Sequence, residues 1–540
     1  MRSAVLLLLA GVLAFPGAAE AARFAVGVAP GSKADALAAR LEANTGGKAS
    51  VIGPFAVSVT ADSAAGIRGT FGVSYVERLG VPRKLAFTPT DPFYVAGRQW
   101  YVSVVRGFDA WTLRPTLPGM RVAVIDSGID AGHPEFRGRI AGYKSFVGGS
   151  ALKDTQGHGT FVAGLMAARI DNQEGIAGMA FPAQLLVAKV VRYDGVVPLE
   201  AEARAIRWAV DHGARVINLS LGGMRDPIDS SRDSYSPLEA SAVAYAIRKG
   251  AVVVAAVGNG DQAPEQPWRY ASYPAALPHV LGVSALARDG SVPLYSNRDP
   301  LYNDVAAPGD DLLSTLPRTI TAQRPTCLEQ GYSDCGPTEY RHAQGTSFAS
   351  AIVSAAAVLV RLEWPALRAE QVVGLMERSA VDQTAATGCR RCVDGHDPQT
   401  GWGRLDTTGA ITWGGRLLPA DRYETNDNAG PRAFALSNKK RSLQASVDYW
   451  DDQNDVYAVR LKRRQRITLS LAGPAKVDLN LALWKPGTTR IDRLRQPAAT
   501  SARPGGREYL SYRTKRGGVY FVQVKLSEPG TTTYKLKLAR

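Results

Sequence analysis

The sequence predicts an α/β domain with a parallel sheet sandwiched by helices, preceded by a small α+β unit and followed by an all-β sandwich. Between residues 121 and 413, short apolar runs alternate with stretches of helical periodicity. Apolar runs of this length suit parallel strands that are buried on both faces. After residue 414 the pattern changes to alternating polar and apolar residues broken by Gly, Pro and Asn, which is typical of a β-sandwich.

The first 21 residues have the three parts of a secretory signal peptide. A single positive charge at Arg2 precedes an apolar run over residues 4–15, and an Ala-x-Ala sequence ends at Ala21. The apolar run is well below the roughly 20 residues needed to cross a membrane. We therefore expect residues 1–21 to be removed and the protein to be exported, to the periplasm or the extracellular space.

Residues 22–86 predict the small α+β unit. Strand-like patterns occur at residues 24–28, 55–59 and 73–77, and residues 34–41 have helical spacing. A small unit directly after a signal peptide is either a binding module or a propeptide.

The central domain is expected to span residues 87–413. Four apolar runs predict its strands: residues 122–125, 185–188, 216–219 and 252–255. Helical spacing at residues 200–210 and 238–247 places helices between them. The long apolar run over residues 348–360 carries Ser350 and Ser354, so we expect a core helix there rather than a membrane span.

The tail is expected to consist of a linker at residues 414–420 and a β-sandwich at residues 421–540. It also carries most of the net charge of +15, because residues 421–540 contain 24 Lys and Arg against 11 Asp and Glu, a net +13. Basic residues concentrate at 460–466 and 513–516, and in alternating strands some of them must share a face. We expect a positive patch that holds the protein to an anionic surface; the alternative is that the charge only keeps the domain soluble.

Four cysteines occur in this exported chain, so disulfides are expected. Four cysteines allow three pairings. Local pairing is favoured because Cys327–Cys335 and Cys389–Cys392 would each close a short loop. A zinc site is the alternative, and the single Cys-x-x-Cys, with no second pair, argues against it.

Three segments carry side chains that together suit nucleophilic catalysis. Asp126 ends an apolar run, His158 lies between two glycines, and Ser347 precedes the long apolar run. Each residue alone has an ordinary structural interpretation as a turn or helix cap. Together they supply a nucleophile, a base to take its proton and a carboxylate to orient that base. Asp126 also lies where open α/β sheets place their sites, and the hydroxyl of Ser127 can donate a hydrogen bond to it.

Asn259 adds a fourth group. It follows the apolar run at residues 252–255 within the sequence Val-Gly-Asn-Gly. Its side-chain amide can donate a hydrogen bond to the oxyanion that forms when a serine attacks a carbonyl carbon. We therefore predict Asn259 as the oxyanion donor.

These segments, in the order Asp, His and Ser, resemble the subtilases. The likeness covers roughly residues 86–413 and rests on residues 126–130, 157–164 and 345–350. It implies a secreted serine endopeptidase with a parallel sheet between helices, which acts on protein or peptide substrates. The same resemblance implies that residues 22–86 are a propeptide that assists folding and inhibits the enzyme until it is removed.

Further segments resemble members of this group or domains attached to them. Residues 87–93, followed by Gln99-Trp100, are similar to the mature N-terminus of thermitase-like subtilases. Residues 423–427, with residues 455–459, resemble the bacterial pre-peptidase C-terminal domain.

The resemblance also implies substrate contacts. Ser220, Leu221 and Gly222 would pair with an extended substrate and, with Gly258, line the primary specificity pocket. Ser272 would lie near the base of that pocket. A neutral base implies a preference for large apolar residues before the scissile bond.

A structural calcium ion is implied in the same way. Hard oxygen ligands from side chains and loop carbonyls suit calcium. The positions that match the family's strong calcium site are Asp91, Glu135, Asn172, Ile170, Glu174 and Ile176. The alternative is a loop closed by hydrogen bonds alone, since Glu135 is longer than the aspartate usual there.

A different class of function is also open. The chain could be a catalytically silent subtilase-like protein whose basic sandwich binds a partner. All four catalytic positions are intact, which favours an enzyme, and we expect this enzyme to be a monomer.

Overall fold

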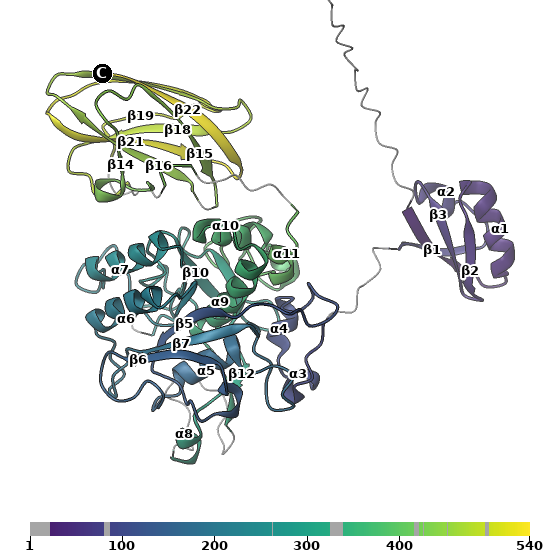
Figure 1. Cartoon of the computed structure of the whole chain (residues 1–540). Helices are drawn as coiled ribbons and strands as arrows, with labels where there is room; N and C mark the ends of the chain where they lie inside the picture. Colours follow the sequence, from purple (N-terminus) through teal and green to yellow (C-terminus); the bar gives the residue numbers. More distant parts are fainter. Residues whose placement is uncertain are drawn as a thin grey trace, which may run out of the picture. The chain divides into compact units, whose positions relative to one another are not determined.

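The computed structural model describes residues 22–79, 87–261, 263–323, 339–414, 421–424, 426–450, 452–491 and 496–540. The chain separates into two compact units, Met1–Leu85 and Ala86–Arg540 (Figure 1). The predicted signal peptide lies outside the described residues.

The first unit is a small α+β fold. Its antiparallel sheet has the strand order β2-β3-β1-β4. The elements are β1 (Ala22–Val28), α1 (Ala34–Thr45), β2 (Ala49–Gly53), β3 (Ala56–Ala61), α2 (Ala65–Arg68) and β4 (Val73–Arg78). Leu37 and Leu41, four positions apart on α1, are fully buried with Val57 and Val59 of β3. The helical and alternating spacings of these apolar residues thus meet in one core.

The second unit begins with a seven-stranded parallel sheet in the order β11-β10-β9-β8-β5-β7-β6. Its strands are β5 (Met120–Asp126), β6 (Ile140–Ser145), β7 (Ala183–Lys189), β8 (Val216–Leu219), β9 (Val252–Ala256), β10 (Val280–Leu286) and β11 (Val305–Pro308). All four strands predicted from apolar runs are confirmed. An antiparallel pair, β12 (Leu312–Thr315) and β13 (Tyr340–Ala343), lies outside this sheet.

Helices cover both faces of the parallel sheet. Alternate residues of β5 show the division, because Val122 and Val124 belong to one buried core and Ala123 and Ile125 to another. Helices α5 and α9 pack on the first face, and α6 and α7 on the second. The helices of this part are α3 (Pro92–Val95), α4 (Trp100–Val104), α5 (His158–Ala167), α6 (Leu199–Asp211), α7 (Pro237–Arg248), α8 (Arg318–Gln323), α9 (Thr346–Glu363), α10 (Ala369–Ser379) and α11 (Thr407–Ile411).

Helix α9 is long and apolar enough to cross a membrane. However, 83% of its most apolar stretch is buried inside the protein. Its packing against the parallel sheet explains its composition, as predicted from the sequence.

The C-terminal part is a β-sandwich. One sheet has the order β14-β16-β21-β18-β19 and the other β15-β22-β17-β20. Their strands are β14 (Phe434–Ala435), β15 (Ser442–Asp448), β16 (Asn454–Leu461), β17 (Arg466–Ala472), β18 (Leu479–Trp484), β19 (Ala499–Ser501), β20 (Arg507–Arg513), β21 (Gly518–Leu526) and β22 (Thr531–Ala539). Alternate residues of both sheets, such as Leu469 and Val522, meet in a common core.

Candidate active site

Asp126 is the last residue of β5 and is almost completely buried. Its Oδ1 accepts a hydrogen bond of 2.6 Å from the backbone N–H of Ser127. We expected the Ser127 hydroxyl to make this bond, and the structure corrects that expectation: the hydroxyl donates to Asp154 Oδ1 at 2.9 Å. Side chains of adjacent residues in an extended segment leave the backbone in opposite directions, so the Ser127 side chain is directed away from Asp126.

His158 is the first residue of α5. Its Nδ1 lies 2.9 Å from both Oδ1 and Oδ2 of Asp126. Burial lowers the pKa of His158, but the charge of Asp126 and the hydrogen bond to it outweigh burial, so the pKa is raised from its ordinary value. With Nδ1 donating to the carboxylate, Nε2 is the nitrogen that can accept a proton from a nucleophile.

Asp154 holds the segment around His158 in place, and the sequence reasoning missed it. Its Oδ1 accepts from the N–H of Gly157 at 2.9 Å, and its Oδ2 accepts from the N–H and hydroxyl of Thr160 at 2.9 and 2.7 Å. Asp154 therefore supplies acceptors to the first turn of α5 and links it to Ser127. An acidic residue a few positions before a helix start is a capping pattern that could have indicated this role.

Ser347 lies in the first turn of α9. Its hydroxyl donates to the carbonyl oxygen of Ser220 at 3.1 Å, and no hydrogen bond joins it to His158 in this structure. Helices α5 and α9 nevertheless bring the two residues into one site, since the ring centroids of His158 and Phe348 are 5.4 Å apart. Hydrogen bonds of catalytic groups are often incomplete before substrate binds.

Asn259 follows β9, and its side chain is held by Thr346. Asn259 Oδ1 accepts from the N–H of Thr346 at 2.9 Å and from its hydroxyl at 2.8 Å. With the amide oxygen engaged in this way, the amide nitrogen is left to donate to another group. Thr346 is thus a positioning residue that the sequence reasoning did not identify, although it directly precedes Ser347.

A pocket of about 210 Å³ lies beside these groups and includes Ser347 and Asn259 in its lining. All five residues predicted to contact substrate line it: Ser220, Leu221, Gly222, Gly258 and Ser272. Gly258 has a φ of 99°, and a Cβ there would lie 2.4 Å from Ser272 Oγ, so the pocket requires glycine at this position. Met224, Trp268 and Asn297, which the sequence reasoning did not single out, also line the pocket.

Three of the residues expected to bind calcium, Asp91, Glu135 and Asn172, have side-chain oxygens that already accept hydrogen bonds. Glu135 accepts from the N–H of Ile176 at 2.9 Å, from Asn172 Nδ2 at 3.0 Å and from the Tyr340 hydroxyl at 3.1 Å. Asn172 therefore directs an amide donor, not its oxygen, toward Glu135.

The side-chain oxygens of Asp91 and Asn172 are engaged in the same way. Asp91 accepts from the N–H groups of Asp171 and Asn172, and Asn172 Oδ1 accepts from the N–H of Glu174. Ile170, which directly precedes Asp171, is buried. With their side-chain oxygens engaged in this way, Asp91, Glu135 and Asn172 do not fit a calcium ion as they are arranged, and we derive no step through one.

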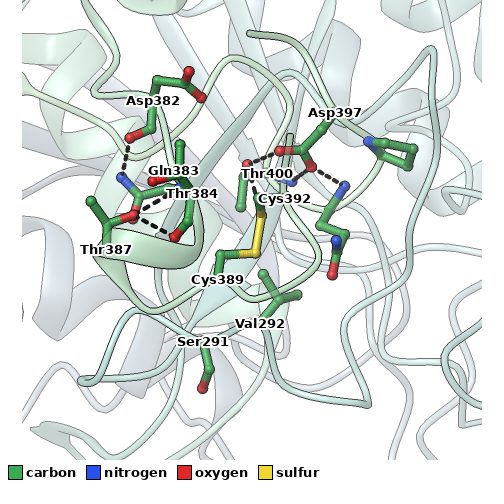
Figure 2. Close-up of a disulfide and its surroundings, with 12 residues drawn as sticks. Ser291, Val292, Asp382, Gln383, Thr384, Thr387, Cys389, Cys392, Asp397 and Thr400 are labelled. Carbon is green, nitrogen blue, oxygen red and sulfur yellow. Dashed lines mark hydrogen bonds between the residues drawn. A yellow bond between two sulfur atoms is a disulfide. The ribbon is translucent and has the colours of Figure 1, made fainter. Parts of the chain in front are cut away.

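Cys389 and Cys392 form a disulfide. Figure 2 shows this bond with Thr400 beside it, whose hydroxyl oxygen lies 3.7 Å from Cys392 Sγ. The local pairing predicted for these two residues is present, so they do not serve as zinc ligands. The predicted pair Cys327–Cys335 lies outside the described residues.

The buried carboxylate, the imidazole held by it and the serine with its neighbouring amide lie at the carboxyl edge of a parallel sheet. This arrangement defines a serine hydrolase of the α/β class. A sequence profile described as the subtilase family, Peptidase S8, matches residues 118–403. The chain belongs to the subtilase family and is a subtilisin-like serine endopeptidase. The matched range leaves the first unit and the C-terminal sandwich outside it.

Two relatives compared by sequence agree with this assignment. Thermitase of Thermoactinomyces vulgaris is 35% identical over 44% of this chain and 78% of its own length. The thermophilic serine proteinase of Bacillus sp. strain AK1 is 33% identical over 61% of this chain and 70% of its own. Among solved structures, Sphericase covers 61% of this chain and 99% of its own, with 27% identity and a TM-score of 0.46.

Proposed function

We propose that this enzyme hydrolyses peptide bonds through an acyl-enzyme formed on Ser347. The observation that supports this best is the contact of His158 Nδ1 with both oxygens of Asp126, beside a pocket lined by Ser347 and Asn259. A histidine oriented in this way is a suitable base for a serine hydroxyl, which is a poor nucleophile on its own.

Each group has a distinct role in the reaction. Ser347 Oγ attacks the substrate carbonyl carbon while its proton passes to His158 Nε2, and Asp126 stabilises the imidazolium. Asn259 Nδ2 donates to the oxyanion. Cleavage of the C–N bond then takes the proton from His158 to the leaving amine. Water, deprotonated by the same histidine, attacks the ester and restores Ser347.

The pocket supports a preference for large apolar residues before the scissile bond. Its lining includes Met224 and Trp268, together with Asn297 and Ser272, and none of these side chains carries a charge. Asn297 Nδ2 donates to Ser272 Oγ at 3.3 Å. Asp261 lies at the exposed side of the same lining. Profiling with a peptide library should show Phe, Leu and Met exceeding Lys and Arg at this position, and the reverse order would contradict the proposal.

A fluorophosphonate probe tests the activated serine directly. The mature protein should be labelled and should hydrolyse a chromogenic peptide, whereas Ser347→Ala should lose both properties. Ser231→Ala, which removes another serine outside the pocket, serves as the matched control and should keep both. A protein that folds but does not react would support the alternative of a silent binding protein.

Export and maturation form a second part of the proposal. Related proteins include both an intracellular and a cell wall-associated protease, so export here rests on the signal-like residues 1–21. Residues 22–86 would act as an inhibitory propeptide that the enzyme removes itself. Ser347→Ala should then accumulate as a precursor cleaved after the signal peptide but not near Phe87. Normal cleavage near Phe87 would show that another protease processes the chain.

A basic surface on the sandwich supports binding to an anionic surface. The turns after β16 and β20 lie side by side, since Arg464 N–H donates to Thr514 O and Gln465 N–H to Thr514 Oγ1, both at 2.9 Å. The Lys and Arg side chains of both turns are exposed: Lys462, Arg463, Arg464, Arg466, Arg513, Lys515 and Arg516.

Elution from heparin resin tests this surface. The double substitution Arg464→Gln with Lys515→Gln should lower the salt concentration of elution, because it removes two positive charges from this surface. Salt screens exposed charges over about 10 Å at 0.1 M, so a weaker surface is released at lower salt. Lys535→Gln with Lys537→Gln removes the same charge from β22 and serves as the control. Equal shifts for the two variants would indicate general charge rather than a binding surface.

A further inference from the structure

A cavity of about 520 Å³ lies beside helix α7 and is lined by residues of both the catalytic domain and the sandwich. The two parts belong to one compact unit, Ala86–Arg540. Three arginines line the cavity: Arg248, Arg432 and Arg490. They come from three segments, which are the end of α7, the 3-10 turn before β14 and the segment after β18. Folding therefore brings three positive charges to one place, which we call the arginine cavity.

Contacts between these segments hold the arginines around the cavity. The N–H of Ile491 donates to Asn428 Oδ1 at 3.0 Å. This bond ties the segment of Arg490 to the segment of Arg432. The guanidinium of Arg490 also lies over the ring of Tyr235, 5.9 Å from its centroid, and Tyr235 lines the same cavity just before α7. The positions of these side chains are thus set by the fold.

The arginine cavity has too few negative charges to offset its arginines. Among the described residues that line it, the one carboxylate is that of Asp427, and His279 Nε2 lies 2.7 Å from its Oδ2. The arginines therefore outnumber the carboxylate three to one. In the part of the chain that the structure describes, no ion pair involves Arg248 or Arg432. A net positive charge remains in the cavity.

Partial burial makes this excess charge costly. Arg432 and Arg490 are both half-buried. Burial lowers the pKa of Arg432, and the charges of Arg490 and Arg248 lower it further, although Tyr235 and Asp427 act in the opposite direction. A guanidinium stays protonated in proteins, so the repulsion is not relieved by loss of a proton. An anion placed between the arginines would relieve it.

We propose that the arginine cavity binds a tetrahedral oxyanion, phosphate or sulfate. A guanidinium group presents its N–H donors in a planar fork, which pairs with two oxygens of such an ion at once. A dianion would offset two of the three positive charges. The volume of the cavity accommodates the ion together with several bound water molecules.

The bound ion would join the two parts of the chain that line the cavity. Arg248 belongs to the catalytic domain, whereas Arg432 and Arg490 belong to the sandwich. An ion that contacts all three would hold the sandwich against α7. Because an ion bound only to the folded chain stabilises it by mass action, phosphate should also raise the melting temperature.

Isothermal titration calorimetry with sodium phosphate tests the site in the full chain carrying Ser347→Ala, which prevents self-digestion. The parent should bind phosphate, sulfate should displace it, and chloride at the same concentration should not. Arg432→Gln and Arg248→Gln should each weaken phosphate binding at least tenfold. Arg248 is exposed, so its substitution should leave the fold intact. Arg432→Lys keeps the charge and should recover part of the lost affinity.

A matched control comes from the basic turns of the sandwich. Arg464→Gln with Lys515→Gln removes two positive charges from residues that do not line the arginine cavity. This double variant should change phosphate binding less than twofold.

Three results would overturn the proposal. Failure of the parent to bind phosphate, or binding that survives both Arg432→Gln and Arg248→Gln with unchanged circular dichroism, would show that the cavity is not the site. Loss of binding in the control variant, with the cavity variants unaffected, would assign the ion to the basic turns. Displacement of phosphate by chloride at the same concentration would indicate general charge attraction rather than an oxyanion site.

Discussion

The hydrogen-bonded region around Glu135 and the acidic cluster formed by Asp421, Glu424, Asp427, Asp452 and Asp455 both bury carboxylates, but the oxygens in the two regions have different partners. Glu135 accepts hydrogen bonds from a backbone N–H, an amide and a phenol, all supplied by the chain. In the cluster, Asp452 Oδ1 and Glu424 Oε1 have no partner among the described residues. The first region has its donors from the chain, whereas the second leaves buried carboxylate oxygens without a partner among the described residues.

The comparison teaches that buried carboxylates in one chain can differ in whether the chain itself supplies their hydrogen-bond donors. What matters is whether protein donors already occupy the oxygens. Tyr340 makes this difference at Glu135, because its hydroxyl reaches the carboxylate from β13, far away in the sequence. The three predictions below test the contrast, and all stability measurements use the Ser347→Ala background to prevent self-digestion.

The largest effect is expected for Glu135→Ala. This change creates a cavity and removes the acceptor of three donors, so it should lower the free energy of unfolding of the catalytic domain by about 3–5 kcal/mol. Urea denaturation followed by tryptophan fluorescence measures the loss. Glu174→Ala, at an exposed position in the same loop, should change it by less than about 0.5 kcal/mol. Similar small values for both variants would contradict the role of these hydrogen bonds in stability.

The pH dependence of stability should also identify Glu135. Burial raises its pKa from 4.5 to about 7, against the opposing effect of its three donors. The folded state therefore keeps the proton to higher pH than the unfolded state does. The resulting stabilisation is fully present below pH 4.5 and is lost as pH rises to 7, by at most about 3 kcal/mol. The difference in unfolding free energy between the parent and Glu135→Gln should change over this range, and parallel curves would show that Glu135 does not titrate there.

The smallest effect is expected for Asp452→Asn in the acidic cluster. With EDTA present to remove divalent cations, this change removes one of several repelling carboxylates and should stabilise the sandwich by about 1 kcal/mol. Thermal unfolding provides the test, with Glu528→Gln, at an exposed position of the same domain, as a control that should not shift. A destabilisation would mean that Asp452 acts through packing alone.

Much of the fold follows from local patterns. The apolar runs at residues 122–125 and 252–255 predict buried parallel strands because few other structures hide such runs on both faces, and both runs are strands of the central sheet. The tail's alternating pattern predicts its sandwich for a similar reason. Asp126, His158 and Ser347 were predicted as the catalytic residues because each stands in a short segment typical of subtilases, and the structure brings these segments together.

Other features could not be predicted in this way. The link from Asp154 to Ser127 and the contact of Thr346 with Asn259 are hydrogen bonds between segments that are distant in the sequence, so no short segment reveals them. Ser127 was assigned to the wrong carboxylate because the direction of its side chain depends on the local backbone.

The sequence by itself determined which chemical groups this protein has and the order in which its strands and helices occur. The tertiary structure alone decided which polar groups meet. The Tyr340 hydroxyl reaches Glu135 across 205 residues, and Asp452 approaches Glu424 from a different segment of the sandwich. The physical reason is that apolar periodicity is a local property of a chain, whereas compensation of a buried charge depends on distances of a few ångströms between segments that only folding brings together.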